Sequence, residues 1–177
     1  MRVLRGRDEA TALFQRRRKI EDEAERESVA AILRAVRERG DEAVAEFTER
    51  FDGVRVEEAQ VPPRAFERAV ERVPNALRDA IHLSAERVRS FYDHQPKEGF
   101  VTQEDGSLLG QLVRPLERVA CYVPGGQAPL FSTLIMTAVP AQVAGVPEVV
   151  IASPPDKAGA VPDEVLVAAR ALGLDTV

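Results

Sequence analysis

The sequence is short of the residue types that carry self-sufficient catalytic or metal chemistry. Its 177 residues include one cysteine, no tryptophan and two histidines. A single cysteine excludes an intrachain disulfide. The motifs H-E-x-x-H, C-x-x-C and G-x-S-x-G, which mark zinc proteases, thiol redox proteins and serine hydrolases, are all missing. The chain therefore contains no catalytic motif that works by itself.

Long hydrophobic runs and an excess of positive charge are missing as well. No apolar run approaches the roughly 20 residues that span a bilayer, and residues 1–8 lack the apolar segment of a secretory signal. We therefore expect no membrane partner and a cytoplasmic location. The net charge of −5 argues against nucleic-acid binding. Arg16–Lys19 is the only basic cluster, and the acidic residues that follow it indicate a solvated helix surface.

The charged residues that are present divide the chain in two. Residues 1–100 hold 20 Lys and Arg against 21 Asp and Glu, whereas residues 101–177 hold 4 against 8. A densely charged surface is typical of exposed helices, and a sparsely charged stretch is typical of a buried parallel sheet. The sequence thus predicts an N-terminal helical region over residues 1–100 and an α/β domain that begins at residue 101.

Four amphipathic helices are predicted in the first region. Apolar residues at helical spacing from Val29 to Val36 indicate a helix that ends at Gly40, and Asp41 is expected to N-cap the next one. Pro62-Pro63 begins a third helix. The fourth ends near His94, with Phe91 expected to point inward. His94 and the other histidine, His82, lack partners at zinc-ligand spacing and are interpreted as surface residues.

The second region alternates strand and helix patterns. We expect an edge or antiparallel strand near residues 108–113, buried strands over 119–123 and 148–152, and helices over 132–144 and from Pro162. A third strand is predicted to begin within residues 173–177. These elements form a β-α-β-α-β unit, so the fold class is α/β with an incomplete parallel sheet. Because the sequence stops as a strand begins, we expect the N-terminal part of a longer protein. Ser153–Pro155 leaves a strand where α/β proteins place ligand contacts.

The stretch from Cys121 to Ser132 joins a strand, a Pro/Gly-rich loop and a helix. Gly125 and Gly126 permit close approach to a ligand or form a tight turn. From the residues alone, Tyr122 is best interpreted as a ring packed partly buried on the sheet, and Ser132 as a helix cap. Cys121 is expected to be a buried, unreactive thiol.

Residues 122–133, Y-V-P-G-G-Q-A-P-L-F-S-T, resemble a motif of histidinol dehydrogenase. The resemblance covers the N-terminal portion of that family over about residues 35–177. It also includes these residues: Arg39–Ala43, Phe51-Asp52, Arg114-Pro115, Met136, Pro140-Ala141, Ala144-Gly145 and Ser153–Pro155.

The resemblance implies a zinc- and NAD-dependent oxidation of L-histidinol to L-histidine through the aldehyde, at the end of histidine biosynthesis. It implies a cytoplasmic homodimer and a Rossmann-like domain similar to that of aldehyde dehydrogenases. It also implies that Tyr122 contacts NAD and that Pro124, Gly125 and Gly126 belong to the cofactor-binding loop. The family's zinc ligands and Glu-His pair lie in later segments. No catalytic residue or metal ligand is therefore assigned here, and we expect the chain alone to be inactive.

Two other interpretations remain open from the sequence. Relatives of this enzyme oxidise other small alcohols, so the chain can belong to a zinc- and NAD-dependent dehydrogenase with a different substrate. Alternatively, it is a short, non-catalytic module for nucleotide binding or oligomerisation, in which case an open sheet edge near Val177 would need a partner.

Overall fold

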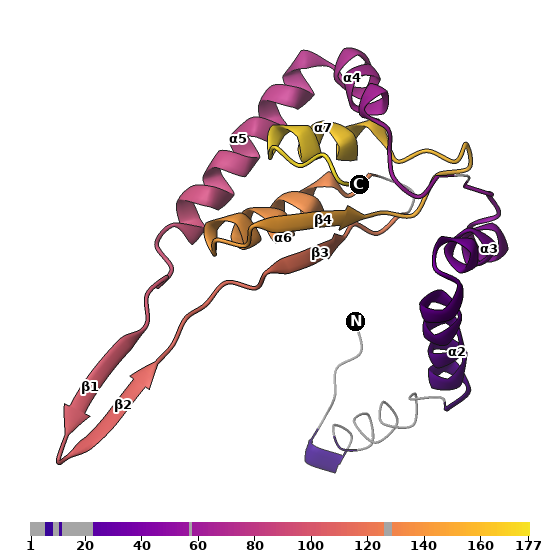
Figure 1. Ribbon diagram of the computed structural model, residues 1–177. Helices are drawn as coiled ribbons and strands as arrows, with labels where there is room; N and C mark the ends of the chain where they lie inside the picture. Colours follow the sequence, from indigo (N-terminus) through magenta and orange to yellow (C-terminus); the bar gives the residue numbers. More distant parts are fainter. Residues whose placement is uncertain (1–5, 9–10, 12–22, 57, 126–128) are drawn as a thin grey trace.

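The structure, a computed structural model, describes residues 6–8, 11, 23–56, 58–125 and 129–177. Arg16–Lys19 and Gly126 lie outside the described residues. No described helix is long and apolar enough to cross a bilayer. The helices and strands, labelled in Figure 1, are α2 (Glu23–Arg39), α3 (Asp41–Asp52), α4 (Pro63–Arg72), α5 (Asn75–Tyr92), β1 (Phe100–Glu104), β2 (Ser107–Gln111), β3 (Arg118–Tyr122), α6 (Phe131–Val143), β4 (Glu148–Ala152) and α7 (Asp163–Ala171).

Helices α2 and α3 follow one another with a single residue, Gly40, between them. Gly40 has a positive φ of 58° and donates its N–H to the Val36 carbonyl at 2.8 Å, as predicted for a glycine that ends a helix. The prediction that Asp41 caps α3 is wrong. Because the turn is so short, Gly40 is itself the N-cap, and Asp41 is the first residue of α3. There its carboxylate still faces the positive end of the helix dipole.

The predicted apolar stripes are buried in α4 and α5 but not in α2. Val29 and Leu33 of α2 are 55% and 56% exposed, whereas Phe66 of α4 and Ile81 of α5 are buried. Figure 1 shows α2 and α3 beside the main body, while α4 and α5 lie over it. The inward position predicted for Phe91 is wrong, since its side chain is 69% exposed. It belongs to the last turn of α5, which ends at Tyr92.

Strands β3 and β4 pair in parallel, with Cys121 opposite Ile151 and Tyr122 opposite Ala152. They were expected to be buried throughout, and that expectation is wrong. Cys121 and Ile151 are buried against helices, whereas Tyr122 and Ala152 on the other face are exposed. Side chains alternate between the faces of a strand, and the described helices cover only one face of this pair.

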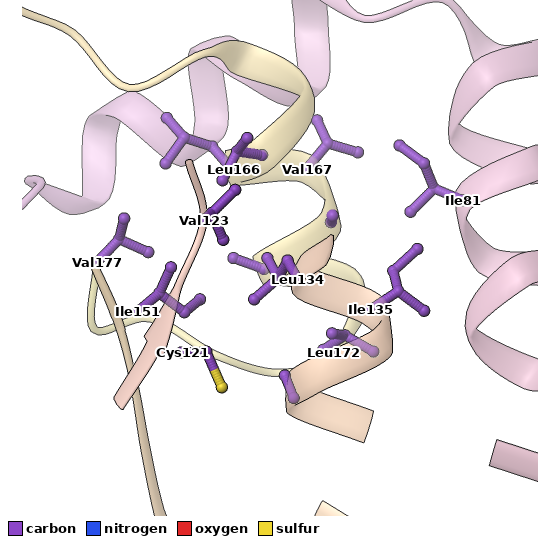
Figure 2. Packing of buried hydrophobic residues seen from close by; sticks show 14 of the residues in the cluster. Ile81, Cys121, Val123, Leu134, Ile135, Ile151, Leu166, Val167, Leu172 and Val177 are labelled. Carbon is purple, nitrogen blue, oxygen red and sulfur yellow. The ribbon is translucent and has the colours of Figure 1, made fainter. Parts of the chain in front are cut away.

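Helix α6 connects the two parallel strands and forms the centre of the core. It contacts β3, β4, α5 and α7, as expected for a helix that is apolar on nearly all sides. Figure 2 shows Leu134 near the middle of the cluster, in a view that places Ile151 toward the sheet and Ile135 toward Ile81 of α5. Pro140 lies inside α6, which continues to Val143. The core is therefore shared by α4, α5, α6, α7 and the parallel strands.

An antiparallel hairpin of β1 and β2 projects from the body (Figure 1). Strand β2 confirms the prediction of an antiparallel strand, whereas β1 was not predicted. Every residue of both strands is exposed, and Val101 and Leu108 are each 71% exposed. An isolated two-stranded hairpin is marginally stable in water, so this one presents apolar surface that lacks a described partner.

The last residues of the chain lie beside β4 without forming a strand of the structure. The Ile151 N–H donates to the Thr176 carbonyl at 2.9 Å, and the Val61 N–H donates to the Val177 carbonyl at 2.8 Å. The Ala152 carbonyl accepts the Val123 N–H, so the polar groups of Ala152 face β3. Because neighbouring residues of a strand direct their backbone polar groups to opposite edges, the Ile151 N–H points away from β3. Thr176 therefore lies at the β4 edge that faces away from β3.

Gln142 joins three helices through its side-chain amide. It accepts a hydrogen bond from Arg89 of α5 at 2.6 Å and donates one to the Leu172 carbonyl, just after α7, at 2.7 Å. Because Gln142 is half-buried, removing its side chain leaves the Arg89 guanidinium and the Leu172 carbonyl without these hydrogen bonds in a place that water reaches poorly. We expect Gln142→Ala to lower the free energy of unfolding by about 1–3 kcal/mol, measured by urea denaturation. Gln95→Ala, an exposed glutamine beyond α5, is the control; equal losses in both variants would contradict the prediction.

Candidate functional site

Tyr122 lies at the carboxyl end of β3, immediately before the glycine loop. Its side chain is 62% exposed, so the interpretation that the ring packs on the sheet is wrong. The reason is the register: Val119, Cys121 and Val123 point toward the helices, and Tyr122 therefore points to the uncovered face. The sheet thus presents an accessible aromatic ring beside the loop.

Gly125 lies against the loop that follows the neighbouring strand. A Cβ atom built on Gly125 would be 2.7 Å from Cγ of Pro154, which is too close for a side chain at that position. Val123 donates its N–H to the Ala152 carbonyl at 2.8 Å, so the two chain segments run side by side up to this contact. The structure therefore brings together Tyr122, half-buried Pro124 and exposed Gly125 at one end of the sheet.

The loop between β4 and α7 is held by Asp156. Its Oδ1 accepts the N–H groups of Ala158 at 2.8 Å and Ala160 at 3.0 Å. Its own N–H donates to the Ala160 carbonyl at 2.8 Å, and Gly159 provides the positive φ of 79° that the turn requires. The side-chain and backbone bonds together close the turn over residues 156–160, which begins two residues after Pro154.

Helix α6 begins one residue earlier than predicted, at Phe131. Its N-cap is Leu130, which makes no side-chain capping hydrogen bond. Ser132 lies inside the first turn and is exposed. The prediction that Ser132 caps the helix is therefore wrong, because its backbone is already helical and the capping geometry belongs to the residue before the helix.

A cavity of about 880 Å³ lies on the other side of the β4–α7 loop. Its walls come from α3, Val56, the segment 58–62, α4, the loop and the start of α7, and Ser153 and Pro155 of the loop contribute to them. Arg72 of α4 and Asp163 of α7 form an ion pair across it at 3.6 Å. Tyr122, Pro124 and Gly125 are not among the lining residues. The exposed ring and the cavity are therefore separate features at the same end of the sheet.

The charged residues of β3 and β4 lie at the opposite, amino end of the strands. Arg118 Nε is 2.6 Å from Glu148 Oε2, in the first pair of the parallel register. The hydrogen bond with Glu148, followed by its negative charge, raises the pKa of Arg118 above its ordinary value. This exposed ion pair ties the two strand ends together and is remote from the loops at their carboxyl ends.

The remaining candidate residues are dispersed. Cys121 is buried and free, as predicted. His82 and His94 are exposed, and His94 Nδ1 lies 2.7 Å from the Ser90 carbonyl oxygen. Within the described ranges, no three His, Cys, Asp or Glu side chains are grouped so that they could hold a metal ion.

The exit loop Ser153–Pro155 was predicted at this end of the sheet, but two of its features were not. The packing of Pro154 against Gly125 joins residues that are distant in the sequence, and no local pattern indicates it. The turn at Asp156 was also missed, although Asp-x-x-Gly between a strand and a helix is a recognisable turn signal. The sequence thus offered a signal for Asp156 and none for the contact.

Parallel strands joined by a helix, with loops gathered at their carboxyl ends, define a mixed α/β protein, and open α/β sheets in general bind their ligands at that end. Family comparison makes the assignment specific. The family model described as histidinol dehydrogenase matches residues 15–177. The chain belongs to the histidinol dehydrogenase family.

Individual relatives agree with this assignment. Histidinol dehydrogenase of Deinococcus radiodurans is 56% identical over 149 residues, which are 84% of this chain and 34% of that protein. The Thermus thermophilus enzyme is 51% identical over 168 residues, 95% of this chain and 39% of that protein. A crystal structure of histidinol dehydrogenase from Elizabethkingia anophelis superimposes with a TM-score of 0.79 at 28% identity, over 85% of this chain and 35% of that one. The chain thus spans between about a third and two fifths of the length of these relatives.

Proposed function

We propose that this chain is the N-terminal, cofactor-loop portion of a histidinol dehydrogenase. In its full-length form such an enzyme oxidises L-histidinol to L-histidine through L-histidinal with NAD and zinc, in the last steps of histidine biosynthesis. The observation that carries the proposal is the family match over residues 15–177, because it includes the Y-x-P-G-G motif that lies at the carboxyl end of β3.

In this proposal the region 101–177 is the first part of a Rossmann-like domain of the aldehyde dehydrogenase type, and residues 1–100 form a helical region. The parallel pairing of β3 and β4 around α6 supports it. The position of Thr176 at the far edge of β4 supports a third strand there. A parallel sheet in such folds is covered on both faces. No described helix covers the face that carries Tyr122, so in this proposal another part of the full-length enzyme covers it.

The cofactor loop consists of Tyr122, Pro124, Gly125 and Gly126, the last of which lies outside the described residues. The exposed ring of Tyr122 fits a contact with a flat ring of NAD, since aromatic side chains stack well on planar groups. Gly125 continues the loop after Pro124 and packs against Pro154. These residues bind and orient the cofactor; they remove no proton and are not assigned to the chemical step.

Zinc does not fit the described residues, which contain no suitable group of ligands. We place the metal ligands and the acid–base residues in the part of the full-length enzyme that this chain does not align with. An alcohol oxidation of this kind requires a group that removes the hydroxyl proton. The chain by itself is therefore expected to be inactive.

A homodimer in the cytoplasm completes the proposal. The β1–β2 hairpin supports self-association, because Phe100, Val101, Leu108 and Leu109 are all at least 59% exposed on an arm that projects from the body. The register places Phe100 and Leu109 on one face of the hairpin and Val101 and Leu108 on the other, so each face carries exposed apolar side chains of the kind found at interaction sites. Nucleic acid is not expected as a partner, given the net charge of −5.

A chimeric enzyme tests the proposed function. The matching N-terminal part of the Thermus thermophilus enzyme is replaced by this chain, which is 51% identical to it over 168 residues. We expect the chimera to reduce NAD when L-histidinol and zinc are supplied, with product followed by absorbance at 340 nm. The 177-residue chain alone, assayed identically, is expected to give no turnover.

The two assays test different parts of the proposal. A chimera that is folded, as judged by circular dichroism, but inactive would contradict the proposal that this chain serves as the cofactor-loop portion. Turnover by the chain alone would contradict the assignment of the chemistry to other segments.

A further inference from the structure

The glycine loop after β3 packs closely against the loop after β4 at Gly125 and Pro154. A Cβ atom on Gly125 would lie 2.7 Å from Pro154 Cγ, 3.7 Å from its Cβ and 3.9 Å from its Cδ. All three atoms belong to the pyrrolidine ring, which cannot turn away as a flexible side chain would. The space that a side chain at position 125 would occupy is therefore already filled by this ring.

Backbone conformation does not explain the glycine at position 125. The φ of Gly125 lies outside the range of +20° to +160° in which other residues are strained. This distinguishes it from Gly40, Gly53 and Gly159, whose φ values are 58°, 73° and 79°. Gly125 is thus required for space, and the residue that imposes the requirement is Pro154.

Pro154 lies between two hydrogen-bonded positions of the chain. Two residues before it, the Ala152 carbonyl accepts the Val123 N–H, and two residues after it, Asp156 begins the turn that its own side chain closes. Its neighbours Ser153 and Pro155 line the 880 Å³ cavity, whereas Pro154 faces the glycine loop. The segment after Tyr122 therefore packs against the loop after β4, at Pro154.

We propose that Pro154 is a positioning residue for the cofactor loop: its ring sets the path of the chain through Pro124 and Gly125 and so fixes the approach of NAD to Tyr122. This inference rests on the proposed function for its cofactor and on the structure alone for its geometry. Displacing a binding loop by about 1 Å can weaken its interactions by large factors, so the contact controls affinity without touching the ligand.

The experiment uses the 177-residue chain and the variants Gly125→Ala, Pro154→Ala, the double variant and Pro155→Ala. Gly125→Ala is expected to lower the thermal midpoint by about 3–6 °C, since overpacking has no room to relax, and to weaken NAD binding about tenfold. In the Pro154→Ala background the added methyl group fits, so it should cost little in either measurement. Pro155→Ala, which removes the adjacent ring that does not contact Gly125, is the matched control and should change NAD affinity less than about twofold.

Backbone ¹H–¹⁵N resonances of Tyr122 and Gly125 report the loop path directly. Pro154→Ala should shift both more than Pro155→Ala does, and calorimetric titration with NAD gives the affinities. If Gly125→Ala costs the same with and without Pro154, or if both proline variants have the same effect, the positioning role is wrong. If the wild-type chain binds no NAD, the assignment of residues 122–125 to the cofactor loop is wrong. The backbone resonances of Tyr122 and Gly125 and the thermal midpoints of the variants then still test whether Pro154 positions the loop.

Discussion

Leu134→Ala is expected to lower the free energy of unfolding by about 2–5 kcal/mol, because it leaves a cavity at the centre of the core. Leu134 is fully buried in α6, the helix that contacts both parallel strands and both α5 and α7. Close packing on all sides leaves little freedom for neighbouring side chains to collapse into the space. A domain with a typical stability of about 5–15 kcal/mol loses a large fraction of it by this one change.

Met136→Ala provides the matched control for this prediction. Met136 lies two residues further along the same helix, and its side chain is 63% exposed. The substitution removes an apolar side chain from α6 without opening an internal cavity, so we expect a loss below about 1 kcal/mol. Urea denaturation followed by circular dichroism measures both. Similar losses at the two positions would show that α6 is not the centre of the core.

The second half of the fold could be predicted from local pattern because its signals are local. Continuous apolar runs bounded by Pro and Gly located β3, α6, β4 and α7 to within a few residues. Strand β1 was not predicted because Phe100–Glu104 contains only two apolar residues, and its side chains are all exposed. Strand β2 is equally exposed but was predicted from the leucines at and after position 108.

Burial was harder to predict than element type. Helical spacing at Val29 and Leu33 indicated a helix correctly, yet both side chains are exposed, because α2 contacts mainly α3. Phe91 is likewise on the predicted face of its helix but exposed, because it lies in the last turn of α5. Periodicity reports which residues share a face; whether that face is covered depends on segments far away in the sequence.

The candidate site shows the same division between local and distant information. The motif containing Tyr122 and Gly125 was found from the sequence because it is contiguous. The exposure of the Tyr122 ring depends on the strand register, and the requirement for Gly125 depends on Pro154, 29 positions later. No residue near Gly125 in the sequence indicates this contact. Only the three-dimensional structure therefore shows that the glycine at position 125 is needed for space and not for a turn.

Tyr122→Ala is expected to weaken NAD binding by about tenfold or more, which corresponds to about 1.4 kcal/mol, within the range of a ring-stacking contact. The ring is 62% exposed, so its removal should leave the thermal midpoint nearly unchanged. Loss of affinity without loss of stability is the signature of a contact made only with the ligand. Calorimetric titration of NAD into wild type and variant, together with a thermal scan of each, measures both quantities.

Two further variants separate the explanations for such a loss. Tyr122→Phe keeps the ring and removes the hydroxyl group, so it should retain most of the affinity if stacking dominates and lose it if the hydroxyl donates or accepts the decisive hydrogen bond. Tyr92→Ala removes the other tyrosine, which packs edge-on against Phe91 at the end of α5, and should leave NAD affinity unchanged. Equal affinities in wild type and Tyr122→Ala would remove this residue from the cofactor site, and the open face of the sheet would then serve only to receive another part of the protein.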